Sequence, residues 1–320
     1  MLTGGTGFIG QKIRRTLVEQ GYRVRFLVRD LQALQVEGPG TPFVGDLLNP
    51  DTLVGIEADI DSVIHCAAIL GKWGFDEEQL NQVNVTGSLN LLRRFEGKSL
   101  RRFVHISAGG VSGPLTSLVG DETTPCHPTT AYERSKWVVE GALLAQAQAF
   151  SLPLLIVRPT FTYGPGDRHK LPLFRSVKKR RFAFIGSGDN LIHPVYIEDA
   201  VAGILLALER GRDGQVYIIG GEKPVSWQVL VYTIAKILKV APPHWQVPEQ
   251  LARVVAIILE NLSQIIPFDP LVTRTRVQMF TGHYGYSIDK AAAELGYKPA
   301  FSLKEGLEKT IQNYLESGFL

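Results

Sequence analysis

Hydrophobic positions follow two different periods along the first half of the chain. Residues 8–20 carry Ile9, Ile13 and Leu17 at four-residue spacing, which predicts an amphipathic helix ending at Gly21. Short apolar runs predict strands at 22–28, 41–47, 61–68, 101–107 and 152–159, with helices at 77–96 and 130–149 between them. Repeated strand–helix units with apolar strands predict a parallel sheet that is covered on both faces.

The alternation becomes irregular after Pro159. The segment TYGPGD at 162–167 is a cluster of turn residues. Beyond it we expect a strand and helix over 194–211, a strand at 215–221 and helices at 226–238, 249–266, 289–295 and 303–317. This more helical part is typical of a substrate-binding region.

Composition excludes several functional classes. The chain has 320 residues, of which 45% are apolar and 20% charged, as in a soluble globular protein. A net charge of +3 gives no reason to expect a nucleic-acid partner. The chain lacks the patterns of a signal peptide and of a membrane-spanning helix. Cys66 lies in an apolar run, which argues against a disulfide and fits a reducing compartment. We therefore expect a cytoplasmic protein without an integral membrane segment.

A glycine-rich loop opens the chain. Gly4, Gly7 and Gly10 recur at three-residue spacing, and the helix predicted after them starts at Phe8. Gly4 permits a tight turn, Gly7 lets a pyrophosphate approach the backbone, and Gly10 lets the helix pack on the sheet. The free N–H groups of such a helix start bind anions. The loop therefore predicts a dinucleotide site.

The strand that should precede this loop is short. Only Met1 and Leu2 come before the motif, whereas strands average about five or six residues. We expect either that translation starts upstream of Met1 or that this chain is a trimmed form.

Two further positions bear on the cofactor. Arg29 ends the strand at 22–28, where an arginine suits the 2′-phosphate of NADP and an acid would suit NAD. Asp30 follows directly, so NADP is the favoured cofactor and NAD the alternative. Asp46 in the segment GDL can accept a hydrogen bond from the adenine amino group, or it is a solvated turn residue.

A tyrosine and a lysine share one helix face. Tyr132 and Lys136 are four residues apart in the helix at 130–149. We expect the ammonium and a cationic nicotinamide to lower the pKa of the phenol, and Lys136 to hold the nicotinamide ribose as well. Ser107 ends the strand at 101–107, the position for a hydroxyl that orients the substrate oxygen. Tyr132, Lys136 and Ser107 are the predicted catalytic residues.

With these residues the chain resembles the extended short-chain dehydrogenase/reductase family over essentially its whole length. The matching segments are TGGTGFIG, GDL, HCAA, NVTGSLNLL, VRPTFTYGPGD, HPVYIEDAVAG and IDKAAAELGYKP, together with Ser107, Tyr132 and Lys136. The resemblance implies an α/β fold: a Rossmann-like, doubly wound parallel sheet with a smaller C-terminal α/β substrate domain. We expect the cofactor domain at 1–158, with returning segments around 189–220, and the substrate-binding domain mainly at 159–320.

The resemblance also implies further cofactor contacts. The backbones of Phe8 and Ile9 would hold the pyrophosphate, and Leu47 would accompany Asp46 on the adenine side. Ala67 and Ala68 would line the nicotinamide, and Pro159 would border its carboxamide. Asn84 would belong to the active-site helix, and the helices at 77–96 and 130–149 would form a homodimer.

The serine position departs from many relatives, which carry two serines where this chain has Ser107 and Ala108. The segment SAGGV also matches the SAGTV type of dihydroflavonol-reductase-like proteins. That match makes Ser107 the hydroxyl donor.

Three functions compete for this fold. The first is an NAD(P)-dependent oxidoreductase acting on an alcohol or carbonyl of a small, apolar, sterol- or flavonoid-like substrate, because 186–200 and 267–277 look like the steroid-dehydrogenase branch. The second is a nucleotide-sugar epimerase or dehydratase, for which Arg168, Lys170, Arg175 and the run at 178–181 are candidate diphosphate ligands. The third is a non-catalytic NADP-binding protein.

Other motifs have structural interpretations. His65, His105 and His193 lack metal-ligand spacing, so we expect them to be structural and expect no metal site. An apolar stripe along 249–266 is typical of a core-facing helix, or of one that walls a pocket or touches a membrane. The basic run at 178–181 is expected to be a solvated helix end or a contact for an acidic ligand.

Overall fold

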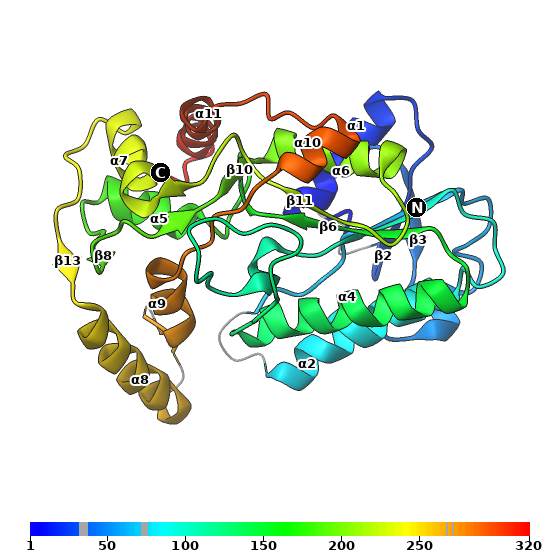
Figure 1. Ribbon diagram of the computed structural model, residues 1–320, viewed down its shortest axis with the longest axis horizontal. Helices are drawn as coiled ribbons and strands as arrows, with labels where there is room; N and C mark the ends of the chain where they lie inside the picture. Colours follow the sequence, from blue (N-terminus) through cyan, green and yellow to red (C-terminus); the bar gives the residue numbers. More distant parts are fainter. Residues whose placement is uncertain (32–37, 72–75, 267, 271) are drawn as a thin grey trace.

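A seven-stranded parallel sheet forms the centre of the molecule (Figure 1). The computed structural model describes residues 1–31, 38–71, 76–266, 268–270 and 272–320; residues 267 and 271, within the steroid-like segment 267–277, lie outside this description. In spatial order the strands are β3 (Thr41–Val44), β2 (Arg25–Val28), β1 (Leu2–Thr3), β4 (Ser62–His65), β5 (Arg102–Ile106), β6 (Leu154–Pro159) and β11 (Val216–Ile219). The order reverses between β1 and β4, as in a Rossmann-like doubly wound sheet. The predicted fold class is confirmed.

β1 occupies the middle of this sheet although it has only two residues. Leu2 pairs with Phe26 on one side and with Ile64 on the other. The other strands are also shorter than predicted; β4, for example, ends at His65, before the apolar residues Cys66, Ala67 and Ala68. The chain segment expected before Met1 stays a prediction.

Helices cover both faces of the sheet, with α1 (Phe8–Glu19), α6 (Ile197–Arg210) and α10 (Asp289–Leu295) on one of them. The opposite face carries α2 (Glu77–Asn81), α3 (Gly87–Arg93) and α4 (Ala131–Ala149) (Figure 1). The single helix predicted at 77–96 is wrong in one respect: a π-helical turn, η2 (Gln82–Thr86), separates α2 from α3. Such turns are rare and often lie at functional sites.

The part of the chain after Pro159 adds short strand pairs and further helices. The pairs are β7 (Phe161–Tyr163) with β10 (Pro194–Tyr196), β9 (Leu191–Ile192) with β12 (Val225–Ser226), and β8 (Phe184–Ile185) with β13 (Gln246–Val247). The helices are α5 (Leu171–Lys178), α7 (Trp227–Ile237), α8 (Glu249–Ile265), α9 (Arg274–Thr281) and α11 (Leu303–Glu316). The sequence pattern did not predict α5, α9 or most of these strands. Within the described ranges, no helix is long and apolar enough to cross a membrane.

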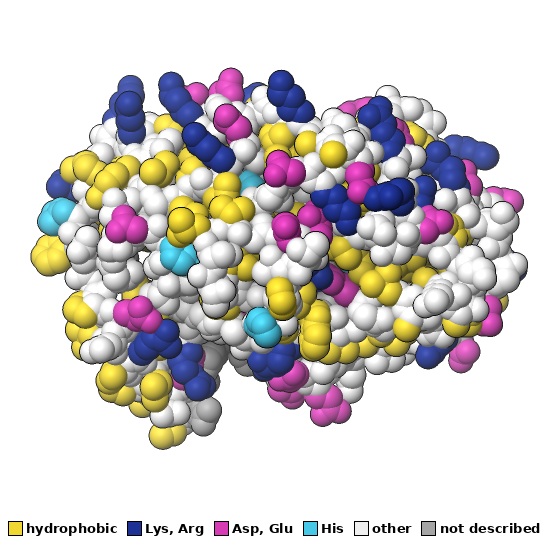
Figure 2. All heavy atoms as spheres, viewed as in Figure 1, with side chains coloured by type: hydrophobic (Ala, Val, Ile, Leu, Met, Phe, Trp, Pro, Cys, Tyr) yellow, Lys and Arg dark blue, Asp and Glu magenta, His cyan; other side chains and the backbone are white. Residues whose placement is uncertain are grey.

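The apolar stripe of α8 does not face the core, so that expectation is wrong. Leu251, Ile258 and Ile265 are exposed, and hydrophobic side chains gather over α8 at the lower left of Figure 2. Ala252 and Ala256 are buried instead, because small side chains let α8 pack against α9.

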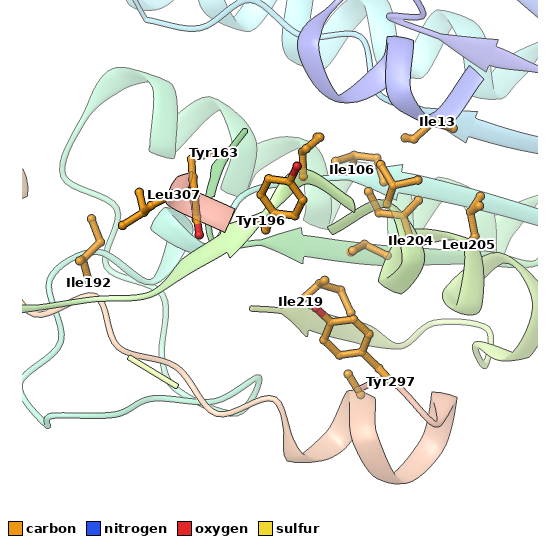
Figure 3. Close-up of a cluster of buried hydrophobic side chains, with 14 of the residues drawn as sticks. Ile13, Ile106, Tyr163, Ile192, Tyr196, Ile204, Leu205, Ile219, Tyr297 and Leu307 are labelled. Carbon is orange, nitrogen blue, oxygen red and sulfur yellow. The ribbon is translucent and has the colours of Figure 1, made fainter. Parts of the chain in front are cut away.

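Two apolar cores hold the sheet between its helix layers. Successive residues of a strand point to opposite faces. Leu154 and Ile156 of β6 therefore join the core under α3 and α4, while Leu155 and Val157 join the core under α1 and α6. Figure 3 shows part of the second core, where Ile106 of β5 lies beside Ile204 of α6. This packing fixes the carboxyl ends of the strands, where the predicted site residues lie.

Candidate active site

The glycine loop adopts a conformation that larger residues would disrupt. Gly4 has a φ of +68°, and a Cβ there would approach the backbone nitrogen of Ala67 to 2.7 Å. A Cβ at Gly10 would lie 2.1 Å from the carbonyl oxygen of Gly4. Gly7 is the N-cap of α1, whose first turn with Phe8 and Ile9 carries no acid. The loop therefore presents an open, uncapped helix start suited to an anion.

Candidate contacts for the adenosine half follow β2 and β3. Arg29 is exposed immediately after the last residue of β2. Asp46 Oδ1 accepts a hydrogen bond from the backbone N–H of Leu48, so this carboxylate stabilises its own turn. Leu47 is buried, and its carbonyl oxygen accepts a hydrogen bond from Asn90. The structure thus supports the turn interpretation of Asp46, while its adenine contact stays a prediction.

A chain of buried polar groups supports the end of β4. Ala67 N–H donates to Thr3 Oγ1, which lies 2.6 Å from His65 Nδ1. His65 Nε2 lies 2.7 Å from Ser88 Oγ of α3. Burial lowers the pKa of His65 to about 3, so its ring stays neutral. His65 has a structural position, as predicted, and it fixes the backbone that leads into Ala67 and Ala68.

Asn84 connects this loop to α4, the helix of Tyr132 and Lys136. Its Oδ1 accepts from Ile69 N–H at 2.9 Å, and its Nδ2 donates to Ser135 Oγ at 3.0 Å. Ser135 Oγ in turn donates to the carbonyl oxygen of Tyr132. Asn84 lies in the π-helical turn η2, which aims its buried side chain between the two elements.

Lys136 reaches from α4 to the end of β5. Its Nζ donates to the carbonyl oxygen of Ile106 at 2.7 Å and lies 3.4 Å from His105 Nε2. Burial lowers the pKa of Lys136 to about 8 and holds the pKa of His105 well below its usual range. The two groups therefore form a buried ammonium beside a neutral imidazole.

Tyr132 lies one turn before Lys136, near the start of α4. Thr130 and Glu133 cap the helix reciprocally at that end. Burial raises the pKa of Tyr132, and the nearby Cys66 and Glu133 act in the same direction. The expected lowering of this pKa by Lys136 together with a bound cationic nicotinamide stays a prediction.

Ser107 follows β5 directly and is buried at 6% exposure. Its Oγ has no hydrogen-bond partner among the described residues. The turn after it, η3 (Gly109–Ser112), packs against the first turn of α4, since a Cβ at Gly110 would lie 3.1 Å from Glu133 Oε1. Pro159, at the end of β6, lies behind Gly109. Ser107 is thus buried at the carboxyl end of β5, next to Ile106, whose carbonyl oxygen accepts the hydrogen bond from Lys136.

Sequence reasoning missed several polar neighbours. Ser112 and Tyr286 lie side by side and are both buried. Glu140 and Arg158 form a buried ion pair at 2.6 Å that ties α4 to β6, and Arg158 also donates to Cys126 Sγ. Cys126 therefore accepts a hydrogen bond from this ion pair. In the sequence, the only indication of the Glu140–Arg158 ion pair is that each of these charged residues stands within an apolar run.

The model of the NAD dependent epimerase/dehydratase family matches residues 1–220. The chain belongs to this family. The 2-alkyl-3-oxoalkanoate reductase of Stenotrophomonas maltophilia is 29% identical over 323 residues, which cover 97% of each chain. The decarboxylating sterol-4-alpha-carboxylate 3-dehydrogenase of Mus musculus is 27% identical, with 97% of this chain and 89% of the relative covered.

A solved structure of the family agrees with the whole fold. The UDP-glucuronic acid 4-epimerase of Bacillus cereus, in complex with NAD, has a TM-score of 0.78 and 25% identity, covering 100% of this chain and 99% of the epimerase. The resemblance to extended short-chain dehydrogenases is confirmed, and with it an enzyme that uses a nicotinamide cofactor. Relatives of both the oxidoreductase and the epimerase kind occur. Among the described residues, no cluster of His, Cys, Asp or Glu is arranged to hold a metal ion.

Proposed function

We propose that this chain is an NADP(H)-dependent oxidoreductase that transfers hydride between nicotinamide and the carbonyl or alcohol carbon of a small, apolar substrate. One observation carries the proposal. Tyr132 and Lys136 lie on one turn of α4, and Lys136 is held at the carbonyl oxygen of Ile106, beside the buried hydroxyl of Ser107.

The fold places the predicted cofactor residues in an order that fits a bound dinucleotide. The Gly4, Gly7 and Gly10 loop would take the pyrophosphate on the first turn of α1, at Phe8 and Ile9. Arg29 would meet the 2′-phosphate of NADP. Ala67, Ala68 and Pro159 would border the nicotinamide, whose ring supplies or accepts hydride when bound.

The chain's own residues would then handle the proton. Because burial keeps the phenol of Tyr132 protonated, it can donate a proton to a carbonyl oxygen during reduction. The Ser107 hydroxyl would donate a hydrogen bond to the same oxygen and hold it in place. Lys136 would place a positive charge beside the phenolate that forms and would contact the nicotinamide ribose.

Support for an apolar substrate comes from two sources. The bacterial reductase and the mouse dehydrogenase are named for an alkyl-substituted oxoalkanoate and for a sterol carboxylate. Three of the residues expected to bind a sugar diphosphate already make contacts within the protein. Arg168 stacks on Phe319, Arg175 donates to the Phe319 carbonyl oxygen, and Lys170 lies over Phe161. These contacts favour the oxidoreductase over the epimerase or dehydratase alternative.

Two features of organisation belong to the same proposal. We assign 1–158 to cofactor binding, with a return around 189–220 that supplies β11, and 159–320 mainly to the substrate. A homodimer through α2, α3 and α4 follows from the family resemblance. Trp137 and Val138 are exposed on α4 and would lie in that interface.

A substrate panel tests the function. The protein is incubated with NADPH and ketones of steroid, flavanonol and 2-alkyl-3-oxo acid type, and separately with NADP⁺ or NAD⁺ and UDP- or dTDP-sugars. We expect loss of absorbance at 340 nm with an apolar ketone and no sugar isomerisation detected by chromatography. Sugar conversion without net reduction of the oxidised cofactor would establish the epimerase alternative instead. No turnover of any substrate by a chain that binds NADPH would favour the non-catalytic alternative.

A further inference from the structure

We propose that the outer face of α8, together with Trp245 and the basic run at 178–181, docks this protein on an anionic lipid surface. The inference goes beyond the proposed function and requires neither the cofactor nor the substrate assignment to be correct. It rests on three exposed features that the active site does not use.

The first feature is apolar surface concentrated on one helix. We call the following exposed side chains the α8 face: Leu251, Val254, Ile257, Ile258, Leu262, Ile265, Ile266 and Phe268. Their exposed fractions run from 38% at Phe268 to 81% at Ile265. Contiguous apolar surface of this kind marks an interaction site, whereas scattered exposed residues do not.

The position and the length of α8 suit contact with a lipid bilayer. α8 packs on α9 and stands away from the central sheet, at the lower left of Figure 1. A helix of 17 residues is about 25 Å long, and α8 presents its apolar residues outward along that length. An amphipathic helix that lies in the headgroup region of a bilayer has this arrangement.

The second feature is positive charge next to α8. Lys178, Lys179, Arg180 and Arg181 are all exposed after α5, as expected for a solvated helix end. Arg181 is three residues, at most about 10 Å of chain, from Phe184 of β8. Phe184 N–H donates to the carbonyl oxygen of Trp245, and the paired strand β13 leads into α8 within two residues. The basic run therefore lies close to the start of the α8 face.

The third feature is an exposed tryptophan at the same place. Trp245 is 65% exposed and stacks on His244. Tryptophan is favoured at membrane–water interfaces, where its ring meets both apolar and polar surroundings. Basic, aromatic and aliphatic side chains thus follow one another along one edge of the molecule.

This combination favours a lipid surface over a second copy of the chain. In a two-fold dimer through the α8 face, the same patch of each copy meets its equivalent. The two basic runs would then approach each other at a cost in electrostatic energy. Anionic headgroups instead attract the run while the α8 face enters the acyl boundary.

Vesicle sedimentation tests the proposal with the full chain. Probes are phosphatidylcholine vesicles with and without phosphatidylglycerol. The face variant is Ile258→Glu with Leu262→Glu, and the charge variant is Lys178→Gln, Lys179→Gln and Arg180→Gln. The matched controls are Leu315→Glu, an exposed leucine of α11, and Lys98→Gln with Arg101→Gln, at the far end of β5. NADPH binding and circular dichroism check the fold of every variant.

We expect wild type and both controls to bind the anionic vesicles and to be released by salt. The face variant should bind at least about tenfold more weakly, because two aliphatic side chains no longer enter the bilayer. The charge variant should lose roughly 100-fold on anionic vesicles, since three cations near the surface are removed. Wild-type protein that stays in the supernatant would overturn the proposal. So would a face variant that converts a dimer to a monomer in light scattering while wild type ignores vesicles, because the α8 face would then join two copies.

Discussion

Lys136 Nζ donates a hydrogen bond to the carbonyl oxygen of Ile106 over 2.7 Å, linking α4 to the last residue of β5. Ser107 follows Ile106 directly, so this one contact sets the distance between the lysine-bearing helix and the serine-bearing strand. The position of the ammonium is therefore fixed by backbone rather than by another charge. Both groups are buried, which strengthens the bond.

The first prediction concerns the charge of Lys136. Since burial lowers its pKa to about 8, the free enzyme should lose the ammonium as the pH rises through that value. We expect kcat/KM to fall above about pH 8, and we expect Lys136→Met to reduce it by about 100-fold or more at pH 7. A pH profile of wild type measures the first effect. A flat profile from pH 6 to pH 10 would contradict the assignment.

The second prediction separates two buried serines. Ser107→Ala should lower kcat by about 100-fold or more, because an oriented donor to the reacting oxygen is lost. Ser112→Ala is the matched control, since it removes a hydroxyl of similar burial that lies beside Tyr286. Steady-state rates of both variants decide the point. The reverse order of effects would make Ser112 the working hydroxyl.

The third prediction addresses cofactor choice. Arg29→Asp should raise the Kd of NADPH by about 10- to 100-fold, because a charge-assisted contact to the 2′-phosphate is lost, and should leave NADH binding nearly unchanged. Arg23→Asp is the control, as it changes an exposed arginine before β2 instead of after it. Fluorescence titration of both cofactors gives the ratio. Equal weakening of NADPH and NADH binding would show that Arg29 does not contact the 2′-phosphate.

The fourth prediction is acid sensitivity from His65. Its folded pKa of about 3 lies below the ordinary value of 6.5, so the unfolded chain binds more protons between these values. Stability is therefore present at neutral pH and is lost as the pH falls below about 6.5, by about 2 kcal/mol at pH 5 for this residue. Urea unfolding at pH 7 and pH 5 measures the slope. His65→Gln should reduce the slope, to which the buried His105 and His193 also contribute, and exposed His127→Gln should not; equal slopes in all three proteins would refute the effect.

The sequence predicts the sheet because its strands are apolar on both faces, and it predicts the dinucleotide loop because glycine is required at fixed positions. Leu155 and Ile156, adjacent in one run, indeed bury on opposite faces. Most of the short strands after Pro159 escaped prediction, because two- or three-residue strands carry no periodicity; β10, in the strand and helix expected over 194–211, is the exception. The π-helical turn η2 also escaped prediction. It places the buried side chain of Asn84 against the backbone of Ile69, and such a tertiary contact leaves no pattern in the local sequence.

The sequence was less informative about pKa values and about the directions in which side chains point. The spacing of Tyr132 and Lys136 indicated one helix face, but it did not reveal that Lys136 is directed to a backbone carbonyl oxygen. The spacing also did not reveal that burial raises the pKa of the Tyr132 phenol. In α8 the hydrophobic pattern found the helix correctly and its buried face wrongly. Packing there depends on the small side chains of Ala252 and Ala256, not on the large ones.

Isotope transfer tests the central claim most directly. NADPH carrying deuterium at both positions of nicotinamide C4 is incubated with the best ketone of the panel, and the alcohol product is analysed by mass spectrometry. We predict one deuterium per product molecule with wild type, and a rate lower by about 100- to 10,000-fold with Tyr132→Phe at unchanged NADPH affinity. Product without deuterium, or a Tyr132→Phe variant as fast as wild type, would contradict the account.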